Sequence, residues 1–269
     1  CHALWPLEKH EFEHALRYVL RCRRPQSESA ATTTDTLVAT GGFLIIQEST
    51  VRLFDSSLSD YFEKTRHRWF PFGHANMAAA CLDALWSRKL LQTSGLPLDS
   101  RSFYGHSACT WGCYLRACPA GLAVEDMALS YLRNTERLQA GNSTAFKLQS
   151  SDMLYGYDVG QGLDAIHVCS IFGLHHLIRR LSPKTLDLDK RVPHHGRTPL
   201  SYACKMNQDQ TVEVLLTLGA NPNLQYDGGP TVLHEAVRLE YPLVVGSLLC
   251  SPSLSLTSLT TQDSEQVPV

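Results

Sequence analysis

Apolar and polar positions in the second half of the chain repeat with a fixed period. Residues 162–169, 196–203 and 229–236 share one pattern: a glycine lies two positions before an Asp or Thr, and a short apolar run follows. The first and second copies are 34 residues apart, and the second and third are 33 apart. Self-similarity of this length predicts a repeat array.

A second apolar segment follows each copy, at residues 174–181, 211–218 and 243–249. In the middle copy Thr198 and Pro199 are typical of a helix start, and Gly219 is typical of the left-handed turn after a helix. Each copy is therefore predicted to be a pair of short helices. Such a pair cannot cover its own apolar faces, so the copies must stack as a solenoid. Leu200, Ala203, Leu215 and Leu216 are expected to be buried between neighbouring pairs.

The first half of the chain has no such period. Residues 11–20 place apolar side chains on one helical stripe, and residues 58–65 and 77–85 also show helical spacing. Two apolar runs, 43–46 and 51–54, lie on either side of a polar turn and predict a β-hairpin. The pattern indicates a small domain of helices and a hairpin, followed by further helices.

Composition narrows the class of protein. The 269 residues include 24 Lys and Arg against 26 Asp and Glu, and 43 % are apolar. This balance is typical of a folded soluble chain and disfavours a basic nucleic-acid binder. Nine cysteines at irregular spacing suggest a reducing compartment, and prolines interrupt the longest uncharged stretch. We expect a cytoplasmic protein without a membrane anchor, and a fragment or processed piece because the first residue is not Met.

Few residues have the spacing that a nucleotide-binding, metal-binding or catalytic site requires. The chain has no G-x-x-x-x-G-K-[ST] loop, so we expect no nucleotide site and no cofactor. His106, Cys109, Cys113 and Cys118 could be drawn as zinc ligands, but they lack paired C-x2-C knuckles, and buried thiols are the favoured interpretation. A hydrolytic site at His106, Ser107, Cys109 and Cys113 lacks a complete G-x-S-x-G turn. A metal-dependent or hydrolytic enzyme is the less favoured alternative.

Residues 158–250, with Gly196 to Ala203 and Gly219 to Asn223 as the most specific stretches, resemble the ankyrin-repeat family. The resemblance implies a protein-binding, non-enzymatic function. Ser201 stands where the family usually has His, and Ser251 follows the third copy in place of the usual Gly. Residues 262–269 look like the opening of a further repeat, so the array is expected to end irregularly or be cut short.

The ankyrin resemblance also implies which positions point outward, in the loops and on the first helix of each pair. Aromatic, Arg and Met residues among them suit the core of an interface. The expected protein-binding positions are Gln161, Leu163, Ile171, Phe172, His194, His195, Arg197, Lys205, Met206, Gln225, Asp227, Arg238 and Leu239.

Residues 4–116 resemble the winged-helix segment of fungal NACHT proteins, the NOD-like receptors of the STAND class. The likeness is carried by Trp5-Pro6-Leu7, by Gly41-Gly42, and by Val51-Arg52-Leu53-Phe54 followed by Asp60-Tyr61-Phe62. Asp55 stands where the family commonly has His. The resemblance implies a regulatory domain that follows a nucleotide-binding module in the chain, and this module would precede Cys1.

Together these patterns predict a mainly α-helical fold in three parts. A small α/β winged-helix domain spans 1–72, a helical connector spans 73–155, and about three ankyrin repeats form an α-solenoid over 156–269. We expect a regulatory fragment of a NACHT-ankyrin signalling receptor that binds a protein ligand, and neither nucleic acid nor membrane. A free-standing ankyrin adaptor is the main alternative.

Overall fold

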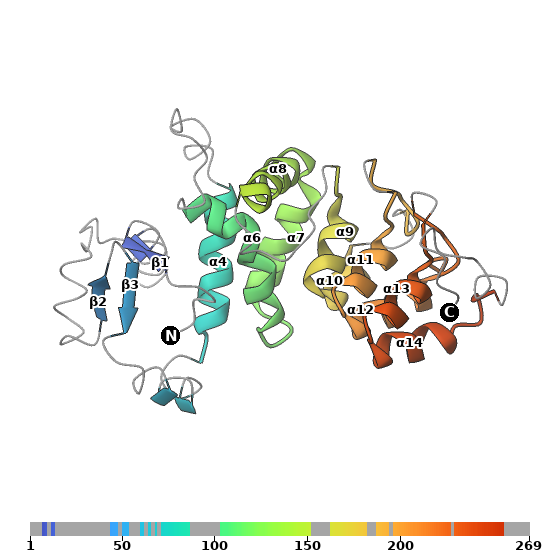
Figure 1. Cartoon of the computed structure of the whole chain (residues 1–269). Coiled ribbons are helices and arrows are strands. Elements are labelled where there is room, and N and C mark those ends of the chain that lie inside the picture. The colour runs from blue at the N-terminus through green and yellow to red at the C-terminus, as the bar shows by residue number, and fades with distance from the viewer. Residues whose placement is uncertain are drawn as a thin grey trace. The chain divides into compact units, whose positions relative to one another are not determined.

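A computed structural model shows two compact units, Cys1–Ala128 and Leu129–Val269 (Figure 1). The structure describes residues 7–9, 12–13, 44–47, 50–53, 60–61, 64–65, 68, 71–86, 103–151, 162–181, 187–193, 196–226 and 229–255. Most of the predicted helices at 11–20 and 58–65 therefore lies outside the described residues.

The first unit contains a small antiparallel sheet. Strand β2 (Leu44–Gln47) pairs with β3 (Thr50–Leu53), and β1 (Leu7–Glu8) pairs with the other edge of β3. The tight turn between β2 and β3 is held by the Thr50 hydroxyl, which donates to the Gln47 carbonyl at 2.8 Å. The predicted hairpin is confirmed. The winged-helix arrangement around it stays a prediction.

Two helices form the core of the first unit. Helix α4 (Gly73–Trp86) packs against α6 (Phe103–Arg116), which confirms the helix predicted at 77–85. Every residue of α6 from Phe103 to Leu115 is buried, including Trp111 and Tyr114. Helix α6 is therefore a central helix and presents no polar face to solvent.

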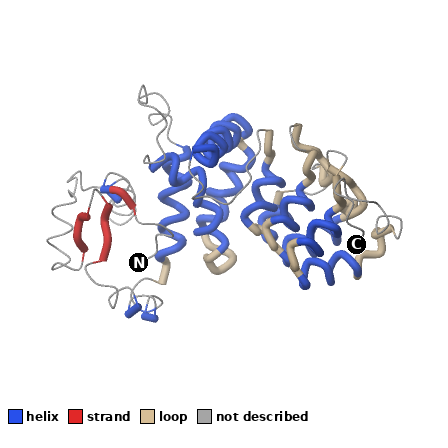
Figure 2. Tube along the Cα trace, in the orientation of Figure 1, coloured by secondary structure: helices blue, strands red, loops and turns tan. Residues whose placement is uncertain are grey.

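The second unit contains the repeat array. Its start is occupied by the end of α7 (Ala123–Arg133) and by α8 (Thr135–Ser151), and three helix pairs follow (Figures 1 and 2). The first helices α9, α11 and α13 pack in a row, and so do the second helices α10, α12 and α14. The predicted solenoid is confirmed. The pairs are α9 (Ala165–Phe172) with α10 (His175–Arg180), α11 (Pro199–Lys205) with α12 (Asp209–Leu218), and α13 (Val232–Arg238) with α14 (Pro242–Leu249).

The helix ends carry the caps that the sequence indicates. The Thr198 hydroxyl accepts from the Ser201 backbone N–H at 3.3 Å, and Pro199 occupies the first turn of α11. Gly219 ends α12 with φ 102°, a left-handed conformation that suits a residue without Cβ. Asp164 caps α9 in the same way as Thr198 caps α11.

Burial agrees with the predicted repeat core at three of its four positions. Leu200, Ala203 and Leu215 are fully buried. Leu216 is only half-buried, so the expectation for this residue is wrong. It lies one residue beyond the buried Leu215, at the edge of the stripe with which α12 faces the core.

The turn between the two helices of each pair requires a left-handed residue. Gly173, Asn207 and Glu240 occupy the same position in the three pairs, with φ of 76°, 53° and 57°. Glycine adopts this conformation without strain and asparagine tolerates it, whereas a Glu Cβ crowds the backbone. The third pair therefore has the most strained turn of the three.

Glu240→Gly is expected to raise the free energy of unfolding by about 1 kcal/mol, because it relieves this strain at an exposed position. Urea denaturation followed by circular dichroism measures the change. Asn207→Gly serves as the matched control and should give a smaller gain. A Glu240→Gly variant less stable than the parent chain would contradict the argument.

Candidate protein-binding surface

The residues expected to face outward fall into three groups. Gln161, His194, His195 and Asp227 lie outside the described residues. Leu163, Ile171 and Phe172 are buried, so their assignment to the surface is wrong. Lys205, Met206, Gln225 and Leu239 are partly exposed. Arg238 is exposed and lies 3.9 Å from the Glu235 carboxylate, and Arg197 is engaged in a closer ion pair with the same group.

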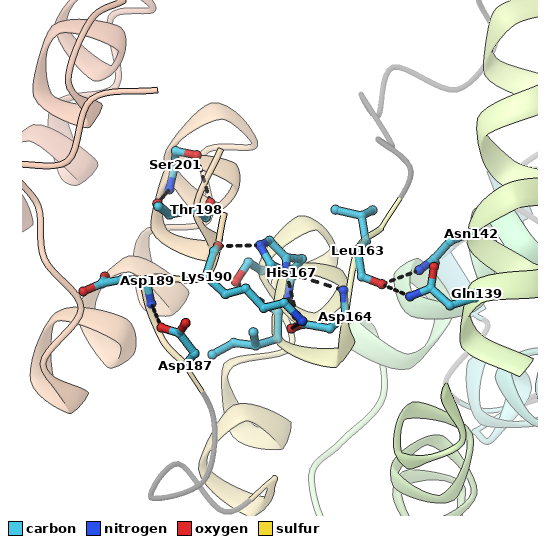
Figure 3. Close-up of polar contacts among 12 residues, drawn as sticks. Gln139, Asn142, Leu163, Asp164, His167, Asp187, Asp189, Lys190, Thr198 and Ser201 are labelled. Carbon is cyan, nitrogen blue, oxygen red and sulfur yellow. Dashed lines mark hydrogen bonds and ion pairs between the residues drawn. The ribbon is translucent and has the colours of Figure 1, made fainter. Parts of the chain in front are cut away.

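Leu163 is buried because the preceding helix covers this end of the array. Its backbone carbonyl accepts from the Gln139 side chain at 2.7 Å and from the Asn142 side chain at 3.0 Å, both on α8 (Figure 3). The two amide side chains fix the segment that leads into α9. Helix α8 thus protects the upstream flank of the repeats.

Ile171 and Phe172 are buried at the end of α9. The next pair reaches this end of the helix, since the Gln208 side chain donates to the Ile171 carbonyl at 3.4 Å. Lys205 and Met206 occupy the same two positions at the end of α11 and are partly exposed. The first pair therefore differs from the second at equivalent positions.

A polar cluster joins the first and second pairs (Figure 3). The ring nitrogens of His167, which is fully buried, lie 2.5 Å from the Asp164 carboxylate and 3.0 Å from the Lys190 carbonyl. The Lys190 ammonium lies 3.1 Å from the other Asp164 oxygen. The loop that enters α11 is thereby attached to the start of α9.

Burial alone would raise the pKa of Asp164. The hydrogen bond and charge of His167, together with those of Lys190, outweigh it and lower the pKa to about 2. A carboxyl group with a lowered pKa stabilises the fold above its unfolded pKa, near 3.8, and this contribution is lost as the pH falls through 2.

Asp164→Asn is therefore expected to lower the free energy of unfolding at pH 7 by about 1 to 2 kcal/mol, allowing for solvent screening. The difference from the parent chain should shrink as the pH falls from 4 to 2. Urea denaturation over this pH range measures it, and Glu213→Gln on the exposed side of α12 is the control. A difference independent of pH would contradict the assignment.

A second cluster joins the second and third pairs and accounts for Arg197. Its guanidinium donates to both carboxylate oxygens of Glu235 on α13, at 2.9 and 3.1 Å. The Tyr226 hydroxyl donates to the same carboxylate at 2.8 Å, and Arg197 lies 4.2 Å from the centre of the Tyr226 ring. Burial, followed by the Glu235 charge, raises the pKa of Tyr226. Because its side chain is only 12 % exposed, Arg197 supports the array and is a poor candidate for ligand contact.

Apart from Gln225, the outward positions that remain accessible among the described residues lie at the ends of two first helices. Lys205 and Met206 end α11, and Arg238 and Leu239 occupy the same positions at the end of α13. Helices α11 and α13 pack against each other, and these four residues lie at equivalent ends of the two helices; we name them the inner-helix ridge. It combines basic and apolar side chains, a mixture that suits a protein interface.

The residues of the alternative enzyme site lie along α6. The His106 Nε2 atom is 3.2 Å from the Tyr114 hydroxyl, and the Ser107 hydroxyl donates to its own helix at the Phe103 carbonyl. Burial lowers the pKa of His106 to about 4, and burial followed by Cys113 raises the pKa of Cys109 to about 12. A thiol with so high a pKa is a weak nucleophile at neutral pH. Among the described residues, no three His, Cys, Asp or Glu side chains are placed to hold a metal ion.

Within the part of the chain that the structure describes, no helix is both long enough and apolar enough to cross a bilayer.

Residues 138–226 match the family model described as "Ankyrin repeats (3 copies)". The match begins in α8 and ends before α13. The third helix pair therefore lies beyond the matched residues, although the structure shows it to repeat the second.

Curated relatives match parts of the chain. An ADP-ribosylation factor GTPase-activating protein of Arabidopsis thaliana is 34 % identical over 29 % of this chain and 10 % of its own length. The B-cell lymphoma 3 protein homolog of Mus musculus is 36 % identical over 28 % of this chain and 17 % of its own. The NF-kappa-B inhibitor delta of Mus musculus is 43 % identical over 22 % of this chain and 18 % of its own.

The matched segments thus span less than a fifth of each of these three relatives. The repeat period, the caps, the stacked helix pairs and the family match agree. The chain carries ankyrin repeats, a domain that is typically non-enzymatic and mediates protein–protein interaction.

Proposed function

We propose that the chain is a protein-recognition module whose inner-helix ridge, Lys205, Met206, Arg238 and Leu239, contacts a protein ligand. The observation that carries the proposal is a difference between equivalent positions. The ends of α11 and α13 are accessible and partly basic, whereas the end of α9 is apolar and buried. The contact surface is therefore two repeats wide.

The cluster of Arg197, Tyr226 and Glu235 supports this proposal because it holds the inner-helix ridge rigid before a ligand binds. Glu235 lies on α13 and holds Arg197, which precedes α11, so the two helices that carry the ridge are tied together. Gln225 and Thr231 also form an antiparallel bridge across the base of the adjoining loop. A surface that is rigid before binding loses less conformational entropy on association.

For the cellular role, we propose a regulatory fragment of a NACHT-ankyrin signalling receptor located in the cytoplasm. The resemblance of residues 4–116 supports this role, and so does the hairpin of β2 and β3 at the stretch that carries part of that resemblance. A relative named as an inhibitor of NF-kappa-B also favours regulation through protein binding. A free-standing adaptor is the alternative, and the transcript upstream of Cys1 distinguishes the two. An in-frame P-loop there supports the receptor, whereas a start codon close to Cys1 supports the adaptor.

The binding proposal is tested by screening the full chain against a display library of proteins from its own organism. Each protein that binds is measured again with Lys205→Ala/Arg238→Ala, and we expect its affinity to fall at least about tenfold. Arg179→Ala, an exposed arginine on the second helix α10, is the matched control and should bind as the parent chain does. Ligands that bind both variants equally well would place the binding surface elsewhere.

A further inference from the structure

The third helix pair exposes apolar residues at positions that are covered in the other two pairs. Val237 on α13 is 43 % exposed, whereas Cys204 and Ser170, which occupy its place on α11 and α9, are fully buried. Burial, followed by the charge of Glu235 on α13, raises the pKa of the Cys204 thiol. Cys204 lies on α11, which packs against α13 of the following pair, whereas Val237 lies at the same position on the last described pair.

The second helix of the third pair shows the same difference. Val245 on α14 is partly exposed, whereas Val212 on α12 and Ile178 on α10, at the same position, are fully buried. Leu243 behaves differently, because its equivalents His176 and Gln210 are accessible within the array. Val237 and Val245 are therefore accessible at positions that are fully buried in both preceding pairs.

A buried polar atom points to the same conclusion. His234 occupies the place of His167, is 5 % exposed and is joined through Nδ1 to the Thr231 hydroxyl at 2.7 Å. Its Nε2 atom is buried and has no hydrogen-bond partner among the described residues. In the first pair the equivalent Nε2 meets the Lys190 carbonyl, which belongs to the loop entering the next pair. A buried polar group without a partner costs free energy, so His234 lacks the contact that such a loop provides.

The backbone after α14 already follows the path that leads into a further repeat. In the loop after α12, the Asn221 N–H donates to the Asp189 carboxylate of the preceding loop at 2.9 Å. One repeat further, the Ser255 N–H donates to the Asn223 side-chain oxygen at 2.7 Å, and the Asn223 side chain donates to the Ser253 carbonyl at 2.7 Å. The same side-chain-to-loop contact therefore recurs with the spacing of the repeats.

We propose that the face formed by His234, Val237 and Val245, here named the stacking face, holds a fourth ankyrin-type helix pair of the same chain. Its loop would supply a carbonyl to His234 Nε2, and its helices would cover both valines. The continuity of the loop contacts through Ser255 favours a pair in the same chain over a separate partner. The sequence agrees, since Val267-Pro268-Val269 follows Thr231 by about one repeat length and resembles Thr198-Pro199-Leu200.

The proposal is tested by extending the full chain beyond Val269 with the remainder of one consensus ankyrin helix pair whose outer face is polar. We expect the melting temperature to rise by about 5 °C and amide exchange in α13 and α14 to slow at least about tenfold. A slowly exchanging ring N–H signal of His234 should also appear in NMR spectra of the extended chain.

Two glutamate variants distinguish stacking from a general effect of the added residues. Val237→Glu should abolish the gain in the extended chain, whereas Leu243→Glu, an exposed leucine outside the stacking face, should preserve it. Both should melt close to the parent in the unextended chain, because both side chains are exposed there. An extension without any gain, or a gain that survives Val237→Glu, would overturn the proposal. So would a dimer of the unextended chain that Val237→Glu dissociates, since a second copy would then be the occupant.

Discussion

Leu215→Ala is expected to lower the free energy of unfolding by about 2 to 5 kcal/mol. Leu215 is fully buried in α12, which packs against both α10 and α14. Removing the larger side chain leaves a cavity in the middle of the array, where neighbours on both sides restrict collapse. Urea denaturation monitored by circular dichroism measures the loss.

Leu216→Ala is the matched control, because the same change is made one residue away at a half-buried position. It should lower the free energy of unfolding by less than about half of the loss expected for Leu215→Ala. Equal losses for the two variants would mean that the burial of Leu215 between the pairs does not determine the stability of the array.

Glu235→Ala is the substitution with the second large expected effect. We expect it to lower the free energy of unfolding by about 3 to 5 kcal/mol. Glu235 is 2 % exposed and accepts two hydrogen bonds from Arg197 and one from Tyr226. The variant removes the negative charge that compensates the Arg197 guanidinium and leaves the Tyr226 hydroxyl without this acceptor. Thermal and urea denaturation report the loss, and Glu213→Ala on the exposed side of α12 should cost little.

A paired substitution at Arg197 and Glu235 separates the contribution of their charges to stability from the contribution of their packing. Arg197→Met combined with Glu235→Leu should recover most of the stability, since an apolar pair of similar volume can replace a buried ion pair. If Glu235→Ala costs under about 1 kcal/mol, the two repeats are not coupled through this cluster.

Several features of the fold follow from local patterns in the sequence. The hairpin of β2 and β3, helix α4 and the three helix pairs were predicted within a few residues, because turn residues and apolar spacing act over a single element. The caps at Thr198 and Gly219 were predictable for the same reason, since a cap depends on its own backbone geometry.

Whether the residues expected to face outward are exposed depends on contacts between segments that are distant in the sequence. Leu163 was expected at the surface, but α8 covers it through Gln139 and Asn142, more than twenty residues earlier. Arg197 was expected to meet a ligand, but its partner Glu235 lies 38 residues further along the chain. No local pattern distinguishes an arginine that faces solvent from one that faces a carboxylate on the next repeat.

Hydrophobic spacing and capping residues are properties of each repeat alone, so the period of the array and its helix pairs could be predicted from the sequence, with helix ends within a few residues. The packing of distant segments fixes which residues the neighbouring pairs cover and which they leave accessible. Ile171 and Phe172 are apolar and buried, whereas Met206 and Leu239, equally apolar at the equivalent position, remain partly exposed. Burial depends on what stacks against a residue, and each repeat meets different neighbours on its two sides.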